Sequence, residues 1–149
     1  RPMEGEFRPG HFAGVCAVVA RLFRTLQPDA ALFGEKDFQQ IRVIEEMVKE
    51  QKIPVSIVRC PTVRDPNGLA LSSRNARLSP EGYRKALAIP RAIRAAQDGK
   101  GIEAAKRELS GLKLDYVTIA DSRIFIAAWV DGVRLIDNDS LAPAKKQLC

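Results

Sequence analysis

Apolar residues recur at helical spacing in two segments near the start of the chain. Over residues 14–27 the spacing predicts an amphipathic helix, ended by Pro28-Asp29, with six apolar side chains along one face: Val15, Val18, Val19, Leu22, Phe23 and Leu26. Over about 37–51 it predicts a second helix with five apolar side chains turned inward: Phe38, Ile41, Ile44, Met47 and Val48.

Two short apolar runs flank the second helix and are typical of strands. Residues 30–33 form a run closed by Gly34, and we expect a buried strand there. Residues 55–59 form a β-branched run between Pro54 and Pro61. Because a strand, a helix and a strand with short links make a βαβ unit, the two strands are expected to be parallel with a right-handed crossover.

After an aperiodic loop at residues 61–77, the pattern changes to helices followed by antiparallel strands. Loops of this length in compact proteins are usually functional or disordered. Ser79-Pro80-Glu81 predicts a capped helix start, and the helix is expected to run towards Gly99 with a break near Pro90. A helix at 102–109 and three strands follow, at 114–120, 124–130 and 133–137, the last two joined by an Asp131-Gly132 hairpin turn.

The predicted fold class is α/β with two domains. Residues 1–77 are expected to form the C-terminal half of a doubly wound, Rossmann-type domain with a parallel sheet. Residues 78–149 are expected to form a small α+β domain with antiparallel strands. The chain starts at Arg1, inside an expected loop, so we expect it to be a piece of a longer protein.

The composition excludes a membrane-spanning protein and gives little support to nucleic-acid binding. No apolar run approaches the roughly 20 residues that a spanning helix needs. The formal net charge of +6 is compatible with nucleic acid, anionic lipid or an anionic small substrate. The Lys and Arg residues are dispersed, however, so most of this charge is interpreted as solvated helix faces.

The three cysteines show no CxxC pair and no metal-ligand spacing, and no metal ligand is assigned from the sequence. Cys16 and Cys60 lie in apolar runs and are expected to be buried free thiols, which fits a reducing cytoplasm. Cys149 is terminal and carries no signal. His11 is the only histidine and by itself makes neither a metal site nor a catalytic triad.

Candidate chemistry follows the first strand, because ligands of parallel sheets bind beyond the carboxyl ends of the strands. Gly34 lets a ligand approach the backbone closely, and the next helix start offers N–H groups to an anion. Lys36 adds a charge suited to a phosphate. Asp37 and Gln40, three residues apart, are placed to hold hydroxyls or a carboxylate. A plain helix start with a solvated Lys36 explains the pattern equally well.

The loop after the second strand carries Ser72-Ser73-Arg74, two hydroxyls and a charged fork in consecutive positions. This is a common way to hold a polyphosphate, although on local grounds a polar turn is the simpler interpretation. Because both strand ends belong to one βαβ unit, their combination favours anion binding. It does not name a reaction.

Four segments carry a resemblance to a known family: RPGHFAGV at 8–15, QPDAALFGEKDFQQ at 27–40, PTVRDPNGLALSSRNARLS at 61–79 and RLIDN at 134–138. In order and spacing they resemble the pantothenate synthetase family over nearly the whole chain. The resemblance implies a nucleotidyltransferase-type Rossmann enzyme of the cytoplasmic route to coenzyme A. It implies that pantoate is joined to β-alanine with ATP and Mg²⁺ through a pantoyl-adenylate, releasing AMP and pyrophosphate.

The resemblance also implies roles for individual residues. Gly34 and Asp37 would contact the ATP ribose, with Glu35 in the same ATP site, and Lys36 would contact the phosphates. Val63 would meet adenine through its backbone, and Leu71 would belong to the ATP site. Ser72, Ser73 and Arg74 would act like a KMSKS-type loop as pyrophosphate leaves. Gln40 would bond pantoate, with Phe33 against its methyl groups. Lys36 and Arg74 would be the catalytic residues.

The chain departs from the family pattern in two places. The family's HxGH-type motif lies upstream of the position of Arg1, together with the first half of the sheet, so this chain alone is expected to be an incomplete ligase. Asp121-Ser122-Arg123 joins two strands where the family has a longer connection, which implies either a shortened turn or a missing segment. The resemblance allows a homodimer and implies no nucleic-acid or membrane partner.

Two other functions stay open. One is a different Rossmann nucleotidyltransferase, such as a cytidylyl- or adenylyltransferase, against which Gln40 and the RPGHF segment argue. The other is a non-catalytic nucleic-acid-binding module, suggested by the +6 charge. Such a module would bind oligonucleotides with a steep salt dependence and would be indifferent to ATP and pantoate.

Overall fold

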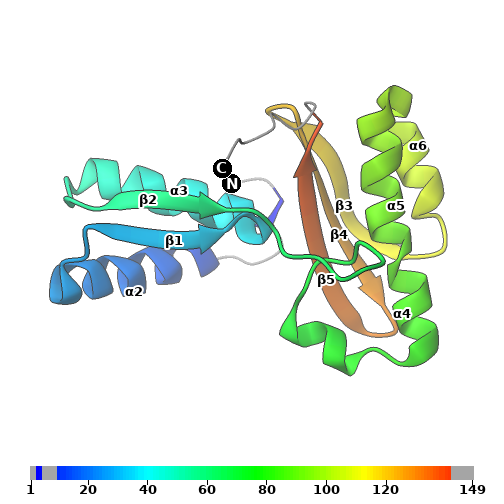
Figure 1. Ribbon diagram of the computed structural model, residues 1–149, viewed down its shortest axis with the longest axis horizontal. Coiled ribbons are helices and arrows are strands. Elements are labelled where there is room, and N and C mark those ends of the chain that lie inside the picture. Colours follow the sequence, from blue (N-terminus) through cyan, green and yellow to red (C-terminus); the bar gives the residue numbers. More distant parts are fainter. Residues whose placement is uncertain (1–2, 5–9, 142–149) are drawn as a thin grey trace. The chain divides into compact units, whose positions relative to one another are not determined.

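A parallel pair of strands organises the first part of the chain in the computed structural model, which describes residues 3–4 and 10–141. Strand β1 (Ala30–Gly34) pairs with β2 (Ser56–Cys60), from Ala30↔Ser56 to Gly34↔Cys60 (Figure 1). A 3-10 turn, η1 (Glu35–Asp37), and helix α3 (Phe38–Glu50) connect them. The predicted parallel βαβ unit is confirmed.

The core of this part lies between two helices and one face of the strand pair. Helix α2 (His11–Leu26) precedes β1, and its Phe23 packs in one cluster with Ile44 and Met47 of α3 and with Ala31, Phe33 and Ile57 of the strands. Strand side chains alternate between faces, so Leu32 and its partner Val58 point the other way. They are 68% and 42% exposed. The prediction of a buried strand at 30–33 is therefore wrong for this chain, because the described helices α2 and α3 both pack on the same face.

Helix α2 is amphipathic, but its buried side is narrower than the apolar stripe in its sequence. Phe12, Ala20 and Phe23 are buried, and Val15 and Val19 are half-buried. The other three apolar side chains of the predicted face are 61%, 50% and 70% exposed: Val18, Leu22 and Leu26. The helix thus offers more apolar surface than α3 and the strands cover.

The helices of the second part start and break where the sequence predicts. Ser79 caps helix α4 (Pro80–Ala86), accepting a hydrogen bond at Oγ from the N–H of Gly82 at 2.9 Å. Helix α5 (Ala88–Ala95) begins after a break at Leu87, because Pro90 has no N–H and its ring collides with the carbonyl four residues earlier. A π-type turn, η3 (Ala96–Lys100), leads to α6 (Gly101–Glu108).

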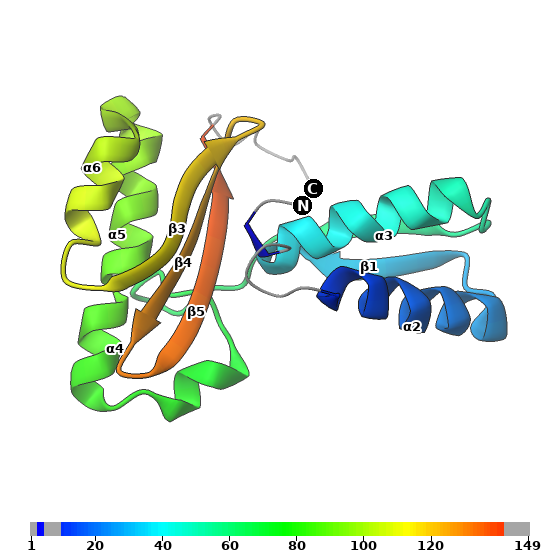
Figure 2. The ribbon, with the colours of Figure 1, turned by 180° about the vertical axis from the view of Figure 1, so that it is seen from behind.

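Three antiparallel strands complete this part, in the order β3 (Lys113–Ala120), β4 (Arg123–Val130) and β5 (Val133–Ser140). Helices α5 and α6 cover one face of the sheet (Figure 2), where Ile89 and Ile93 pack against Ile124 and Ile126 in a buried core. The predicted Asp131-Gly132 turn is confirmed, with φ of 48° and 79°, the left-handed pair of a type I′ hairpin.

The α/β class, with a parallel sheet followed by a small antiparallel α+β unit, is confirmed. The chain divides into two compact units, Arg1–Thr62 and Val63–Cys149. This division lies before the loop at 63–77, whereas the sequence placed it after residue 77. The difference has a physical cause, because Arg64 and Arg74 of the loop bond to strand β5. Within residues 3–4 and 10–141, no helix has both the length and the apolarity to cross a bilayer.

Candidate functional site

The carboxyl end of β1 presents a glycine that neither its backbone nor its packing requires. Gly34 has φ −71° and ψ 130°, which any residue adopts. A Cβ built on it would meet no atom within 4 Å. The space in front of this backbone is therefore left open within the unit, as a close approach by a ligand would need.

Charged and polar side chains follow Gly34 directly. Turn η1 carries Glu35, Lys36 and Asp37, and Gln40 lies in the first turn of α3. Asp37 stands at the cap position of α3 but makes no side-chain cap hydrogen bond, and Lys36 is half-buried. Both observations disfavour the plain interpretation of a capped helix start beside a solvated lysine. They favour a helix N-terminus whose N–H groups can meet an anion.

Arg59, near the end of β2, bonds this edge of the sheet to helix α3. It was not singled out in the sequence. Its guanidinium donates to both carboxylate oxygens of Glu45, at 2.8 and 2.6 Å, and lies 5.0 Å from the ring centroid of Phe38. The hydrogen bonds to Glu45 raise the pKa of Arg59. The positive charge of Arg59 is thus matched within the unit.

Phe33 and His11 occupy structural positions. The Phe33 ring is half-buried and meets Phe23 edge-on, with centroids 6.5 Å apart. Its implied contact with the methyl groups of pantoate stays a prediction. His11 is the first residue of α2 and lies beside Phe12.

Residues 8–9 of the RPGHF segment, and Cys149, lie outside the described residues. Cys16 and Cys60 are free thiols, half-buried rather than fully buried.

In the second unit, residues 63–71 form a small hairpin. The N–H of Leu71 donates to the Val63 carbonyl and that of Asp65 to the Leu69 carbonyl, both at 2.9 Å, on either side of a bridge between Arg64 and Ala70. Val63 and Leu71 are 67% and 52% exposed. An apolar, exposed surface therefore lies beside the backbone of both arms.

The Ser72-Ser73-Arg74 segment follows the hairpin without interruption. Ser72 starts the 3-10 turn η2 (Ser73–Arg77), its Oγ accepting a hydrogen bond from the N–H of Arg74 at 3.2 Å. Ser73 and Arg74 are exposed, and Nη1 of Arg74 donates to the main-chain carbonyl of Arg134 on β5 at 3.0 Å. The Ser72 hydroxyl accepts this bond and keeps its proton to donate to another acceptor.

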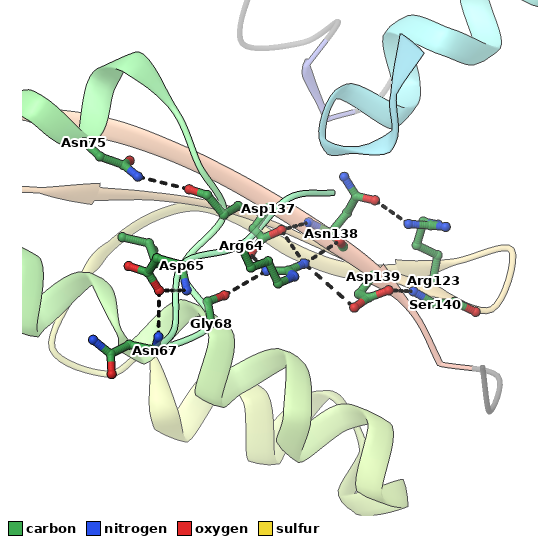
Figure 3. Close-up of polar contacts among 12 residues, drawn as sticks. Arg64, Asp65, Asn67, Gly68, Asn75, Arg123, Asp137, Asn138, Asp139 and Ser140 are labelled. Atoms are coloured by element: carbon green, nitrogen blue, oxygen red, sulfur yellow. Dashed lines mark hydrogen bonds and ion pairs between the residues drawn. The ribbon is translucent and has the colours of Figure 1, made fainter. Parts of the chain in front are cut away.

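An ion pair ties the hairpin to β5 (Figure 3). Arg64 donates to both oxygens of Asp137, at 2.6 and 3.0 Å, and to the carbonyl oxygens of Gly68 and Asn138, at 3.1 and 3.4 Å. Burial lowers the pKa of Arg64, but its bonds to Asp137 outweigh this and raise the pKa above its ordinary value. Burial raises the pKa of Asp137, against the lowering effect of Arg64.

Two further side chains hold the loop from within. The Asp65 carboxylate accepts the N–H groups of Asn67 and Leu69, both at 2.9 Å, and the hydroxyl of Tyr83 at 2.6 Å. The Tyr83 bond is the main reason that the pKa of Asp65 lies below its usual value. Asn75 donates from Nδ2 to the Ala70 carbonyl at 3.0 Å, and its buried Oδ1 has no hydrogen-bond partner among the described residues.

Sequence reasoning missed these supporting residues, although they lie in the segments that carry the resemblance. Arg64 and Asp137 are separated by 73 positions, so no periodic pattern links them. The sequence offers only the residue types, Arg64 in an aperiodic loop and Asp137 at the end of an expected strand, and neither indicates its partner.

Comparison with known proteins decides the family. The chain matches the family model described as pantoate-beta-alanine ligase over residues 1–140. The chain belongs to this family. Ligase membership disfavours the two alternatives that the sequence left open, another nucleotidyltransferase and a nucleic-acid-binding module. The residue roles implied by the resemblance remain predictions.

The relatives that this chain matches are longer than the chain itself. It is 45% identical to the pantothenate synthetase of Rubrobacter xylanophilus over 164 residues, covering 93% of this chain and 56% of that protein. It is 42% identical to that of Paracoccus denitrificans, covering 92% and 57%. The crystal structure of the Thermus thermophilus enzyme matches with a TM-score of 0.89 and 40% identity, covering 95% of this chain and 60% of that one. This likeness confirms the nucleotidyltransferase-like fold.

A further solved relative, pantoate-beta-alanine ligase from Francisella tularensis, is complexed with beta-gamma ATP and beta-alanine. It matches with a TM-score of 0.84 and 38% identity, covering 95% of this chain and 55% of that one. The chain thus spans between 55% and 60% of the length of these solved ligases.

The connection between β3 and β4 is short. Asp121 and Ser122, with φ of 50° and 56°, form a two-residue turn between the paired residues Ala120 and Arg123. The alignment with the Rubrobacter xylanophilus ligase runs over 164 residues, which exceeds the 149 of this chain. That relative therefore has residues in the matched region without a counterpart in this chain.

Proposed function

We propose that this chain carries the ATP-phosphate part of a pantoate–β-alanine ligase site. The proposed reaction is the ATP-dependent condensation of (R)-pantoate with β-alanine to pantothenate, through a pantoyl-adenylate, with release of AMP and pyrophosphate. The observation that carries the proposal is the family match over residues 1–140. The Francisella tularensis ligase, complexed with beta-gamma ATP and beta-alanine, supports ATP as the nucleotide.

The first step transfers an adenylyl group. A carboxylate oxygen of pantoate attacks the α-phosphorus of ATP, the new P–O bond forms, and the bond from the α-phosphorus to the pyrophosphate oxygen breaks. Negative charge therefore grows on the leaving pyrophosphate. Fixed cations and hydrogen-bond donors around it lower the barrier. In the second step the β-alanine amine attacks the acyl carbon, the C–O bond to AMP breaks, and the amine loses a proton.

The family assignment gives each unit its own proposed donors for the first step. Lys36 and the N–H groups at the start of α3 are suited to the ATP phosphates, and Gly34 and Asp37 to its ribose, beside Glu35. Ser73 and Arg74 are exposed and carry a hydroxyl and a planar fork for the departing pyrophosphate, with the Ser72 hydroxyl beside them. Two observations support Lys36 and Arg74 as the catalytic pair. Both carry a positive charge suited to phosphate oxygens, and the side chain of Lys36 is partly exposed and that of Arg74 exposed.

The remaining contacts follow the same assignment. The exposed Val63 and Leu71 offer an apolar surface and adjacent main-chain groups to the adenine ring. Gln40, in the first turn of α3, offers an amide to the pantoate hydroxyl or carboxylate. Phe33 is the proposed apolar contact of pantoate, in competition with its place in the core.

The residues at the end of β1 fit a Mg²⁺ ion that arrives with ATP. No cluster of three or more His, Cys, Asp or Glu that could hold a metal occurs among the described residues. Mg²⁺ in such enzymes needs only one or two carboxylates beside phosphates and water. Glu35 would supply such a carboxylate, because Asp37 is assigned to the ribose. When bound, the ion would neutralise phosphate charge.

Two further proposals concern the surroundings of the enzyme. The exposed α2 stripe of Val18, Leu22 and Leu26 supports a homodimer, because apolar side chains at that spacing can pack against a second copy. Leu22→Lys should then lower the molar mass measured by light scattering. The free thiols Cys16 and Cys60 support the cytoplasm as the compartment.

Calorimetric titration with ATP tests the proposal directly. We expect saturable binding of ATP, tighter with Mg²⁺ than with EDTA, and weaker binding of CTP. Addition of pantoate should tighten ATP binding, because the two substrates are proposed to bind next to each other at the same time. Equal binding of ATP and CTP, or binding of an oligonucleotide with a steep salt dependence while ATP is ignored, would assign the chain to one of the alternatives.

A further inference from the structure

One arginine of the hairpin, Arg64, anchors to strand β5 the segment that the proposed function assigns to ATP. Arg64 lies between Val63, whose carbonyl accepts the N–H of Leu71, and Asp65, whose N–H donates to the Leu69 carbonyl. Its guanidinium donates hydrogen bonds to four acceptors, two on Asp137 and one each on Gly68 and Asn138, and it also forms an ion pair with Asp139, 3.7 Å from Nη2 to Oδ2. Gly68 is the turn of the hairpin, with φ 91°, and the other two acceptor residues belong to β5. One planar group thus joins the arm, the turn and the sheet.

The buried ion pair between Arg64 and Asp137 is not explained by the stability of the fold alone. The Asp137 side chain is 2% exposed and that of Arg64 23% exposed. Removing two charges from water costs free energy, so apolar residues of similar volume often stabilise a fold as well as a buried ion pair does. An ion pair of this kind has another effect, because a fork with four fixed acceptors permits a single orientation of the segment that carries it.

The segment that this fork orients is the one proposed to bind the nucleotide. Val63 precedes Arg64 directly, and Leu71 is bonded to Val63 at 2.9 Å. Ser72 and Arg74 follow within the same loop, where Asn75 closes the stretch back onto Ala70. A rotation of the hairpin on β5 would therefore move the base contact and the phosphate donors together. Misplacement by about 1 Å is enough to lower binding or rate strongly.

We propose that Arg64 and Asp137 are positioning residues for ATP: their ion pair holds the 63–75 loop on β5 in the orientation that binds the nucleotide. This inference rests on the proposed function. Neither side chain is assigned a contact with ATP. Both act through the backbone of Val63 and Leu71 and through the register of the Ser72-Ser73-Arg74 segment.

The sheet offers a matched control. Arg134 and Asp115 form a second ion pair, 2.6 Å between Nε and Oδ2, with side chains 11% and 12% exposed. Asp115 also accepts a hydrogen bond from Trp129 at 2.9 Å. The Asp115 carboxylate thus links β3 to β4 and β5 within the sheet. Asp115→Asn removes a bond to the side chain of Arg134 and leaves its main-chain carbonyl, which holds Arg74, on the strand, so it should weaken the sheet without turning the loop.

The test compares Asp137→Asn with Asp115→Asn in the full chain. Denaturant unfolding gives the stability of each, calorimetry gives the ATP dissociation constant, and amide hydrogen exchange reports on residues 63–75. We expect Asp137→Asn to weaken ATP binding about tenfold, the size of one lost charged hydrogen bond. Exchange should rise in residues 63–75. Asp115→Asn should lose comparable stability, yet keep ATP affinity within about twofold and loop exchange unchanged.

Arg64→Lys covers the case in which Asp137→Asn does not fold. The lysine keeps a positive charge beside Asp137 but loses the fork, so the same loss of affinity and loop protection is expected. If either folded variant binds ATP like the parent, or if Asp115→Asn weakens ATP equally, the positioning role is refuted. If the parent binds no ATP, the proposed function fails. The exchange comparison then still decides whether the ion pair orders the loop.

Discussion

Arg74 donates a hydrogen bond from Nη1 to the main-chain carbonyl oxygen of Arg134, 3.0 Å away on β5. This bond uses one of the five N–H donors of the guanidinium and holds the side chain on the strand that also carries Asp137. Strand β5 therefore supports both ends of the 63–77 loop, through Arg64 at the start and Arg74 towards the end. The 63–77 loop is therefore attached to the antiparallel sheet through β5.

Replacing Arg74 by Lys should weaken ATP binding about tenfold, because one ammonium cannot both reach the Arg134 carbonyl and present a planar fork to phosphate oxygens. The free energy of unfolding should change by less than about 0.5 kcal/mol, as Arg74 is exposed. Calorimetric titration with Mg·ATP measures the first quantity. Arg77→Lys, an exposed change in the same turn η2, is the control. Equal affinities for both variants would remove Arg74 from the phosphate site.

Lys36→Ala should weaken Mg·ATP binding by about tenfold and AMP binding much less, since the proposed contact is with the phosphates, of which ATP carries three and AMP one. Lys49→Ala, at the other end of α3, is the matched control for the loss of a lysine charge. Competition between the nucleotides at constant ionic strength gives both affinities. A parallel loss of AMP and ATP binding would instead indicate a general electrostatic or structural effect.

The sequence predicted most of the elements because their signals are local. Ser79-Pro80 marks the start of α4, and Asp131-Gly132 marks a type I′ turn; both depend on neighbouring residues alone. The carboxyl end of β1 could also be predicted, because strand topology fixes where ligands of a parallel sheet bind. Chemistry at this end followed from residue types in consecutive positions.

What could not be predicted depends on contacts between distant segments. The stripe of Val18, Leu22 and Leu26 has the spacing of a packed face, but which side of α2 is buried depends on where α3 and the strands lie. The place of the 63–77 loop, on β5, depends on an ion pair between residues 73 positions apart. Neither a periodicity nor a turn propensity records such a partner.

Ser122→Gly should stabilise the chain by about 1 kcal/mol, because Ser122 adopts φ 56° at the second position of the β3–β4 turn, where a side chain is strained. Gly132, at the equivalent position of the β4–β5 turn, has φ 79°, and its Cβ would meet no atom within 4 Å. Gly132→Ala should therefore destabilise by a similar amount from backbone strain alone.

Urea unfolding of both variants measures these changes. Gly111→Ala is the control, since its Cβ also meets nothing within 4 Å and its φ is not in the left-handed region. Its effect should be smaller than that of Gly132→Ala. If Ser122→Gly does not stabilise, the turn does not carry the strain that its dihedral angle indicates.

The hydrogen bond between Tyr83 and Asp65 should make the stability of the second unit depend on pH in a defined way. The bond, 2.6 Å long, lowers the pKa of Asp65 from 3.8 and raises that of Tyr83 from 10.0. A lowered carboxyl pKa contributes stability that is present above 3.8 and is lost as the pH falls through the folded value. A raised phenol pKa contributes stability that is present below 10.0 and is lost as the pH rises through the folded value.

Tyr83→Phe removes the bond, so the difference in free energy of unfolding between the parent and this variant should be largest at about pH 5 to 8. It should shrink in acid below 3.8 and in alkali above 10.0. Burial raises the pKa of Asp137, which gives the parent an opposite trend in acid, but this contribution is common to both chains and cancels in the difference. Urea unfolding at a series of pH values measures the curve. A difference that does not change with pH would mean that the Tyr83 hydroxyl stabilises the loop through the hydrogen bond that it accepts from Asn67, at 2.9 Å, and not through the carboxylate of Asp65.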